Sequence, residues 1–219
     1  MKITAFVPFR KGSKSIPDKN IKKLNESPLF KIVIDEILKV SADLLEKVII
    51  ATDYDKNFIL SNLKEDERII FWDRNGYDNA NDKSSTESVI LDYLKETREV
   101  SDYLMLIQIT NPFLTEEHIT KAIKEYTGNG TLFSVVDFKR FIWEENYILG
   151  QEDYERPRRQ DMKNRYLENG SFYIFPVSRF LINKNRMIKP ISFYEMPQES
   201  LWEIDEEKDW KIIEKILKK

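Results

Sequence analysis

Cysteine is missing from this sequence, and its absence excludes several kinds of chemistry at once. Disulfide bonds, thiolate nucleophiles and cysteine-ligated metal sites all require this residue. Histidine is nearly as scarce, because His118 is the only one in the chain. It lies among Glu116, Glu117 and Thr120 at a predicted helix start, where we expect a surface residue and assign it no chemistry.

The sequence also lacks an excess of cations and any long apolar run. Its 35 lysines and arginines face 38 acidic residues, which gives a net charge of −3. A protein that binds nucleic acid through bulk charge needs the opposite balance. No run approaches the roughly 18 apolar residues of a membrane span, and no signal peptide is visible. We therefore expect a cytoplasmic protein that binds neither nucleic acid nor membranes.

What the sequence does contain is an alternation of apolar strands and amphipathic helices. The 219 residues suit one domain with a small appendage, and 41% of them are hydrophobic. Strands are predicted at residues 2–8, 47–52, 68–72, 103–108, 131–136, 171–175 and 201–205, and helices at 29–40, 58–63, 86–96, 115–126 and 206–218. This alternation is typical of an α/β fold with a mostly parallel sheet covered by helices on both faces. In such sheets ligands bind beyond the carboxyl ends of the strands.

A basic loop follows the first predicted strand. Its cations are Arg10, Lys11, Lys14 and Lys19. Gly12 and Ser13 let the backbone turn tightly among them. A buried strand that delivers a glycine-containing cationic loop is a common way to hold a polyphosphate, because backbone N–H groups and lysines face the anion together. The spacing is not that of a Walker A loop, and a solvated basic turn is the alternative interpretation.

Two carboxylates near the C-terminus form a second candidate site. Glu203 and Asp205 stand two positions apart on a predicted strand, so their side chains are expected to share one face. Paired carboxylates at a strand end suit Mg²⁺, which prefers a couple of carboxylates, substrate phosphates and water. The alternative is that both residues simply favour the N-terminus of the following helix.

Several polar residues follow other predicted strands, and each has a structural alternative. Gln108 could contact a polar substrate or belong to an ordinary turn. Arg74, together with Ser84 and Ser85, could hold a nucleotide or lie in a solvated loop. Asp53 is more typical of a helix cap or turn than of a ligand. Because these residues follow parallel strands, we expect them to gather at one edge of the sheet.

The alternating pattern loosens after residue 137. Residues 138–164 combine aromatic residues, a proline and the cationic cluster of Arg156, Arg158 and Arg159. This stretch could form a hairpin or a lobe that projects from the sheet. Its cations could close over an anion or pair with the acids of a second subunit.

Short motifs along nearly the whole chain follow a familiar order. The first are Arg10-Lys11-Gly12-Ser13-Lys14 and Pro17-Asp18-Lys19-Asn20. Further along are Ala51-Thr52-Asp53, Arg74 with Ser84-Ser85, Ile107-Gln108-Ile109-Thr110-Asn111-Pro112-Phe113-Leu114-Thr115, Arg158-Arg159-Gln160-Asp161, Asn169-Gly170-Ser171-Phe172-Tyr173-Ile174 and Glu203-Ile204-Asp205. In order and spacing, these motifs resemble those of the acylneuraminate cytidylyltransferases, also called CMP-sialic acid synthetases.

The resemblance implies a three-layer, Rossmann-like nucleotidyltransferase fold that occupies residues 1–219 as a single domain. Residues 138–165 resemble the projecting dimerisation segment of the family, so a homodimer is implied. The implied reaction transfers CMP from CTP to a sialic-acid-like 2-keto-3-deoxy sugar acid and releases pyrophosphate, with Mg²⁺ as the cofactor.

The resemblance also implies roles for individual residues. The implied catalytic residues are Arg10, Lys14, Lys19 and Asp205. The implied metal ligands are Glu203 and Asp205. The implied nucleotide-binding residues are Gly12, Ser13, Asn20, Arg74 and Ser85. The implied substrate-binding residues are Gln108, Arg165 and Asn169.

Three positions depart from the family pattern. Glu203 replaces the first metal aspartate, and its extra methylene changes the expected geometry of the metal site. Leu114 and Leu167 stand where the family has arginines, and the nearby Arg165 could substitute for the second. Fewer sugar-side cations suggest a different acceptor, so legionaminic, pseudaminic or another nonulosonic acid fits as well as sialic acid. The alternatives are a 3-deoxy-manno-octulosonate or other sugar-acid cytidylyltransferase, and a non-catalytic nucleotide-binding homologue.

Overall fold

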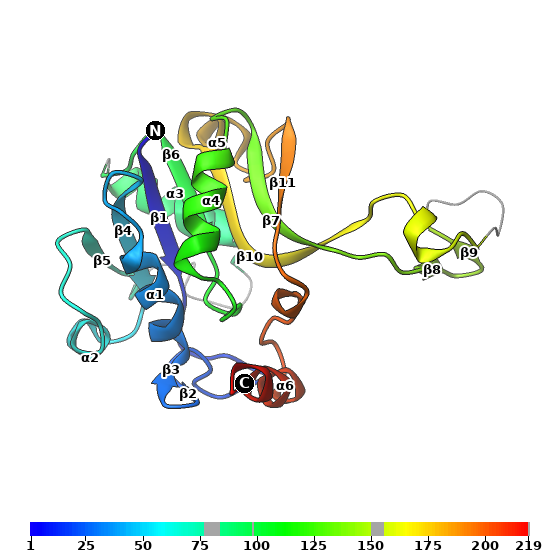
Figure 1. The fold of residues 1–219 in the computed structure, drawn as a ribbon. Helices are drawn as coiled ribbons and strands as arrows, with labels where there is room; N and C mark the ends of the chain where they lie inside the picture. Colours follow the sequence, from blue (N-terminus) through cyan, green and yellow to red (C-terminus); the bar gives the residue numbers. More distant parts are fainter. Residues whose placement is uncertain (77–83, 98, 150–155, 219) are drawn as a thin grey trace.

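A central sheet of seven strands organises the computed structural model, which describes residues 1–76, 84–97, 99–149 and 156–218. Across the sheet the strands are ordered β11-β7-β10-β6-β1-β4-β5 (Figure 1). They are β1 (Ile3–Pro8), β4 (Leu45–Thr52), β5 (Ile69–Asp73), β6 (Tyr103–Ile107), β7 (Thr131–Asp137), β10 (Tyr166–Pro176) and β11 (Ile191–Glu195). Neighbouring strands are parallel except at β10, which runs antiparallel to β6 and β7. The predicted mostly parallel sheet is therefore confirmed.

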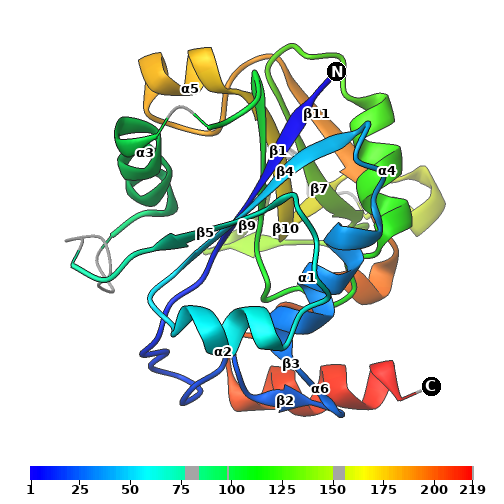
Figure 2. The same cartoon turned by 90° about the vertical axis from the view of Figure 1, so that its left-hand side faces the viewer.

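Helices cover both faces of this sheet and make it the middle of three layers (Figure 2). The helices are α1 (Leu29–Lys39), α2 (Lys56–Ser61), α3 (Thr86–Glu96), α4 (Glu116–Glu125), α5 (Val177–Asn183) and α6 (Glu207–Leu217). Helices α1 and α4 share one core with Ile3 and Val7 of β1, whereas α3 and α5 share the other core with Phe6. Alternate residues of one strand enter two different cores, so the strand is buried on both faces and all but Thr4 of its residues are apolar. Among the described helices, none combines the length and apolar character that crossing a bilayer requires.

A smaller third cluster holds the C-terminal helix against the basic loop. Its buried members are Ile16, Leu24, Leu29, Phe113, Ile204, Trp210 and Ile213. Helix α6 lies beside the short hairpin of β2 (Lys23–Leu24) and β3 (Ser27–Pro28) in both views (Figures 1 and 2). Burial of these apolar side chains brings the end of the chain to the loop that follows β1.

The predicted strand over residues 201–205 is wrong. A short 3-10 helix spans Gln198–Leu201, and the residues that follow pair with no strand in the described part of the chain. The N–H of Ile204 donates to the carbonyl of Thr110 at 2.8 Å, and the carbonyl of Ile204 accepts from Lys19 Nζ at 2.7 Å. One backbone bond and one side-chain bond thus satisfy the groups that a strand ladder would have used.

An arm projects from the sheet between β7 and β10 (Figure 1). Its hairpin consists of β8 (Trp143–Glu144) and β9 (Tyr147–Ile148). The side chains of Ile142, Trp143 and Leu149 on this arm are exposed. The arm falls within the predicted segment 138–165, of which residues 150–155 lie outside the described residues.

His118 lies at the N-terminus of α4, as predicted, but it is half-buried. Its N–H donates to the Thr115 hydroxyl, and the N–H of Thr115 donates back to His118 Nδ1, both at 3.4 Å. Burial is the largest cause that lowers the pKa of His118. The neutral imidazole is thereby favoured, and only that form can accept through Nδ1. The histidine therefore completes the cap of α4.

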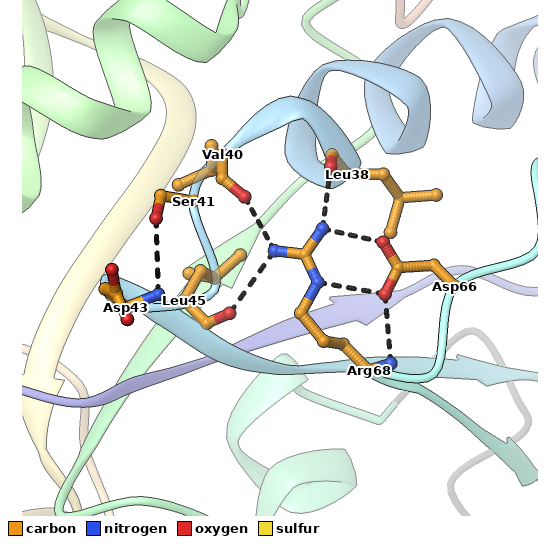
Figure 3. A network of polar contacts seen from close by, with 7 residues as sticks. All are labelled: Leu38, Val40, Ser41, Asp43, Leu45, Asp66 and Arg68. Carbon is orange, nitrogen blue, oxygen red and sulfur yellow. Dashed lines mark hydrogen bonds and ion pairs between the residues drawn. The ribbon is translucent and has the colours of Figure 1, made fainter.

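An arginine clamps the junction between α1 and β4 (Figure 3). The Arg68 guanidinium donates to the carbonyls of Leu38 and Val40, both at 2.6 Å, at the end of α1. It also donates to the two carboxylate oxygens of Asp66, at 2.9 and 2.7 Å. The planar fork of the guanidinium therefore satisfies carbonyls that the end of a helix leaves without a partner.

Replacing Arg68 by alanine is expected to lower the free energy of unfolding by about 2–3 kcal/mol, because these acceptors lose their charged donor. Urea denaturation followed by circular dichroism measures the loss. Lys95→Ala is the matched control, since Lys95 is an exposed cation with an ion pair to Asp92. The control should change stability by less than about 0.5 kcal/mol. Equal losses in the two variants would contradict the clamp.

Candidate active site

A cavity of about 490 Å³ opens at the carboxyl edge of the sheet, beyond the ends of β1 and β6. Its lining residues are Pro8, Phe9, Arg10, Ser13, Lys14, Ser15, Lys19, Asn20, Thr86, Gln108, Ile109 and Thr110. They come from the end of β1 and the loop after it, the loop after β6 and the first turn of α3. The cavity thus lies at the edge where ligands of parallel α/β sheets bind.

Many of the predicted site residues converge on this cavity. It gathers Arg10, Ser13, Lys14, Lys19, Asn20 and Gln108. Gly12 turns the same loop with a φ of +73°, a left-handed conformation that favours glycine. Cationic, hydroxyl and amide groups that face one space form a surface suited to a polyanion.

Two buried polar side chains fix the backbone conformation of the basic loop. Asp53 Oδ1 accepts from the N–H of Lys11 at 2.7 Å, and Asn20 Nδ2 donates to the carbonyl of Arg10 at 2.8 Å. The sequence favours a cap or turn role for Asp53, but the cap of α2 is Asp55 and Asp53 anchors the loop. Its place directly after a buried strand is the signal that could have identified it.

The predicted nucleotide-binding residues Ser85 and Arg74 lie near the cavity without lining it. The Ser85 side chain caps α3 by accepting from the N–H of Ser88 at 3.2 Å. The next residue, Thr86, lines the cavity, although its sequence pattern did not single it out.

Arg74 is a buried cation, only 3% exposed. Burial lowers the pKa of Arg74, and the neighbouring Asp53 carboxylate opposes that shift while Arg10 adds to it. The three charges therefore lie close together, and Arg74 adds to the positive potential at the base of the loop.

Lys19 joins the basic loop to the segment that carries the predicted metal ligands. Its side chain is 12% exposed, and Nζ lies 3.5 Å from Asp205 Oδ1. The same ammonium donates to the carbonyl of Ile204, and Ser15 Oγ donates to the carbonyl of Asp205. The Asp205 carboxylate is itself 72% exposed, so it stands in solvent next to cations that line the cavity.

Glu203 is more deeply placed than Asp205. The pKa of Glu203 is raised to about 7. Burial of the side chain is the main cause, and the nearby Asp205 carboxylate adds to the shift. The side chain packs against the backbone of Gly170, where a Cβ would clash with Oε1 and Cδ of Glu203. A cation held by these carboxylates would reduce the free-energy cost of burying the Glu203 charge. It would also reduce the repulsion between Glu203 and Asp205.

These oxygen donors fit a magnesium ion that arrives with a phosphate ligand. In the part of the chain that the structure describes, no group of three or more His, Cys, Asp or Glu side chains could enclose a metal. Mg²⁺ commonly binds through one or two carboxylates and completes its shell with substrate phosphates and water. Glu203 and Asp205 could supply such carboxylates beside the cationic loop.

Two of the predicted substrate-binding residues lie away from the cavity. Arg165 donates to the carbonyls of Arg140 and Leu149 in the arm, at 3.0 and 2.7 Å. Asn169 is 1% exposed, and its Nδ2 donates to Oγ and the carbonyl of Ser200, at 3.0 and 3.2 Å. In this structure Arg165 braces the arm and Asn169 holds the segment around Ser200. Their contact with a sugar stays a prediction that this geometry does not support.

The chain is similar to known proteins over almost its whole length. A family model described as cytidylyltransferase matches residues 4–218. The chain is 34% identical to N-acylneuraminate cytidylyltransferase B of Danio rerio, over 96% of this chain and 50% of that protein. It therefore spans about half the length of that relative. It is 26% identical to pseudaminic acid cytidylyltransferase of Campylobacter jejuni, over 94% of this chain and 91% of that protein.

A solved structure shares the architecture of the sheet and its helices. It is 4-diphosphocytidyl-2C-methyl-D-erythritol synthase from Anaerococcus prevotii, with a TM-score of 0.71 over 99% of this chain and 96% of that one. At 14% sequence identity, this likeness concerns the fold alone. The predicted α/β class is therefore supported by both topology and comparison.

Proposed function

The chain belongs to the cytidylyltransferase family, and from that premise we propose that it transfers CMP from CTP to a sialic-acid-like 2-keto-3-deoxy sugar acid and releases pyrophosphate. The geometry of one loop supports this proposal most directly. The loop that supplies Arg10, Lys14 and Lys19 to the cavity is joined, through Lys19, to the segment that carries Asp205. Cations for a triphosphate and carboxylates for a metal thus meet at one edge of the sheet.

The proposed reaction is a displacement at the α-phosphorus of CTP. The oxygen of the anomeric hydroxyl forms the new bond to phosphorus, the bond to the departing pyrophosphate breaks, and the hydroxyl proton is released. Arg10, Lys14 and Lys19 would neutralise the charge that builds on the pyrophosphate, an effect that is strongest for groups held in place beforehand. Bound Mg²⁺, held by Glu203 and Asp205, would supply further charge neutralisation and lower the pKa of the attacking hydroxyl.

The remaining residues of the loop and cavity would bind and orient the two substrates. The backbone at Gly12 and Ser13 would face the phosphates, because the loop turns there. Asn20 would act through the loop, since it holds the carbonyl of Arg10. Gln108, at the end of β6, would contact the sugar.

The acceptor is proposed to be a nonulosonic acid. The similar proteins of Danio rerio and Campylobacter jejuni are named for N-acylneuraminate and pseudaminic acid, respectively. Leu114, where the family pattern has an arginine, is buried in the core and so does not face a ligand. Leu167 is exposed on β10 but carries no charge. These two positions therefore offer the acceptor no cation.

We also propose a homodimer formed through the arm, and action in the cytoplasm, where CTP is available. Ile142, Trp143 and Leu149 support the arm as an interface, because exposed apolar side chains that gather on one element favour association. Light scattering gives the mass in solution. A species of 26.2 kDa at micromolar concentration would contradict the dimer.

Pyrophosphate release tests the proposed reaction. The protein is incubated with CTP, Mg²⁺ and a panel of acids that contains N-acetylneuraminic, legionaminic, pseudaminic and 3-deoxy-manno-octulosonic acid. We expect release with at least one nonulosonic acid, and the matching CMP-sugar in the mass spectrum. Release with the octulosonic acid alone would mean that the acceptor is an octulosonic acid and not a nonulosonic acid. Binding of CTP without release from any acid would favour a non-catalytic nucleotide-binding protein.

A further inference from the structure

We propose that Asn111, Asn169 and Ser200 form a buried clamp that positions the Glu203 carboxylate against Gly170. The inference rests on the proposed function, because Glu203 is one of the carboxylates proposed to hold the metal. The clamp residues would touch neither substrate nor metal, so they are positioning residues. The family resemblance implies that Asn169 contacts the sugar, whereas here we propose that it positions Glu203.

The clamp ties together three segments that are distant along the chain. Asn111 Nδ2 donates to the carbonyl of Asn169 at 2.9 Å and to the carbonyl of Ser200 at 2.8 Å. Asn169 Nδ2 donates in turn to Ser200 Oγ at 3.0 Å. All three residues are buried. A buried hydrogen-bond network of this kind rigidifies the segments that it joins, because breaking one bond leaves a polar group without a partner.

The first segment contacts Glu203 through the residue that precedes Asn111. The Thr110 side chain lies close enough to the Glu203 carboxylate to lower its pKa, in opposition to the larger effect of burial. The carbonyl of Thr110 also accepts from the N–H of Ile204 at 2.8 Å. Displacement of Asn111 would therefore move a neighbour of the carboxylate and the backbone bond that holds Ile204.

The second segment contacts Glu203 through the residue that follows Asn169. Gly170 has a φ of +63°, and a Cβ at this position would clash with Oε1 and Cδ of Glu203. Because Asn169 is bonded to Ser200, the glycine backbone moves together with the segment that leads to Glu203. The carboxylate is thus confined by Gly170 and by Thr110.

This confinement matters more for a glutamate than for the aspartate of the family pattern. Glutamate has one more rotatable bond, so a ligand of this type loses more side-chain entropy when it is ordered by a metal. If the fold already restricts the glutamate side chain, less side-chain entropy is lost when the metal binds. The clamp therefore accounts for how Glu203 could serve at a position where the family pattern has a shorter side chain.

Binding of Mn²⁺ to the protein in complex with CTP, with no acceptor present, tests the inference, because the ion is proposed to arrive with a phosphate ligand. Wild type, Gly170→Ala and Asn111→Ala are titrated with Mn²⁺ while electron paramagnetic resonance reports the free ion. The Mg²⁺ activation constant and the KM for CTP at saturating Mg²⁺ are measured in parallel. We expect both metal constants to rise about 10-fold in the variants, as for the loss of groups that orient a metal ligand. The KM for CTP should stay near the wild-type value.

Arg68→Ala is the control. It weakens the fold at the junction between α1 and β4, away from Glu203, and should leave Mn²⁺ binding unchanged. If Gly170→Ala or Asn111→Ala fails to fold, Ser200→Ala removes only a hydroxyl and should raise the constants about threefold. Unchanged Mn²⁺ binding in a folded variant, or no Mn²⁺ binding by the wild type, would overturn the inference. The proposed function fails separately, if the wild type releases no pyrophosphate with any acid of the panel.

Discussion

Replacement of Lys19 by alanine is expected to lower kcat for the proposed CMP transfer by about 100- to 1000-fold while the fold stays intact. The Lys19 ammonium lines the cavity, is mostly buried and lies between the basic loop and Asp205. A cation fixed there stabilises the charge on departing pyrophosphate without first having to reorganise. Single-turnover pyrophosphate release measures the loss, and circular dichroism verifies the fold.

Lys22→Ala is the matched control for this variant. Lys22 also links the N-terminal part of the chain to α6, since its Nζ lies 2.9 Å from Glu207 Oε1 and 4.6 Å from the ring centre of Trp210. It does not line the cavity. The control should keep most of its turnover and lose no more than about 1 kcal/mol of stability. Equal losses of turnover would mean that Lys19 acts through the docking of α6, and unchanged turnover in Lys19→Ala would remove its catalytic role.

Replacement of Asp205 by alanine is expected to raise the Mg²⁺ concentration for half-maximal activity by about 10- to 100-fold. The Asp205 carboxylate is 72% exposed beside Lys19, so the change should alter metal binding far more than stability. Higher Mg²⁺ should restore part of the activity, because Glu203 would still bind the ion. The measurement is a Mg²⁺ titration of pyrophosphate release at saturating CTP.

Glu207→Gln separates this effect from a general loss of negative charge. Glu207 is an exposed carboxylate at the start of α6, and it pairs with Lys22 instead of Lys19. Its Mg²⁺ titration should match that of the wild type. If the titration of Asp205→Ala also matched the wild type, the carboxylate pair would lose its proposed metal role.

Most of the fold follows from patterns that are local in the sequence. The apolar run of residues 2–8 and the helical spacing of residues 29–40 predict β1 and α1 to within about two residues. The basic loop can also be recognised in the sequence, because its glycine and lysines stand close together directly after a buried strand, although a solvated turn has the same local pattern. The cavity accordingly gathers most of the residues that this loop was expected to contribute.

The segment 201–205 shows where local reasoning fails. Its alternation of apolar and acidic residues predicts a strand, but the backbone of Ile204 bonds to Thr110 and Lys19. Those partners lie far away in the sequence. An alternation with a period of two residues predicts an extended chain with two different faces, but it does not predict which groups will bond to the backbone. An extended segment held by isolated bonds and a segment held in a ladder therefore look alike in the sequence.

Local sequence patterns specify the alternation of strands and helices, the basic loop and the order of motifs that resembles one family. Each of these depends on residues that are close together along the chain. Packing of distant segments, by contrast, brings Asp53 to the loop, buries Asn169 and places Glu203 against Gly170. These contacts join segments that meet only after the apolar faces have packed, and no local period specifies which polar side chains will then lie opposite one another.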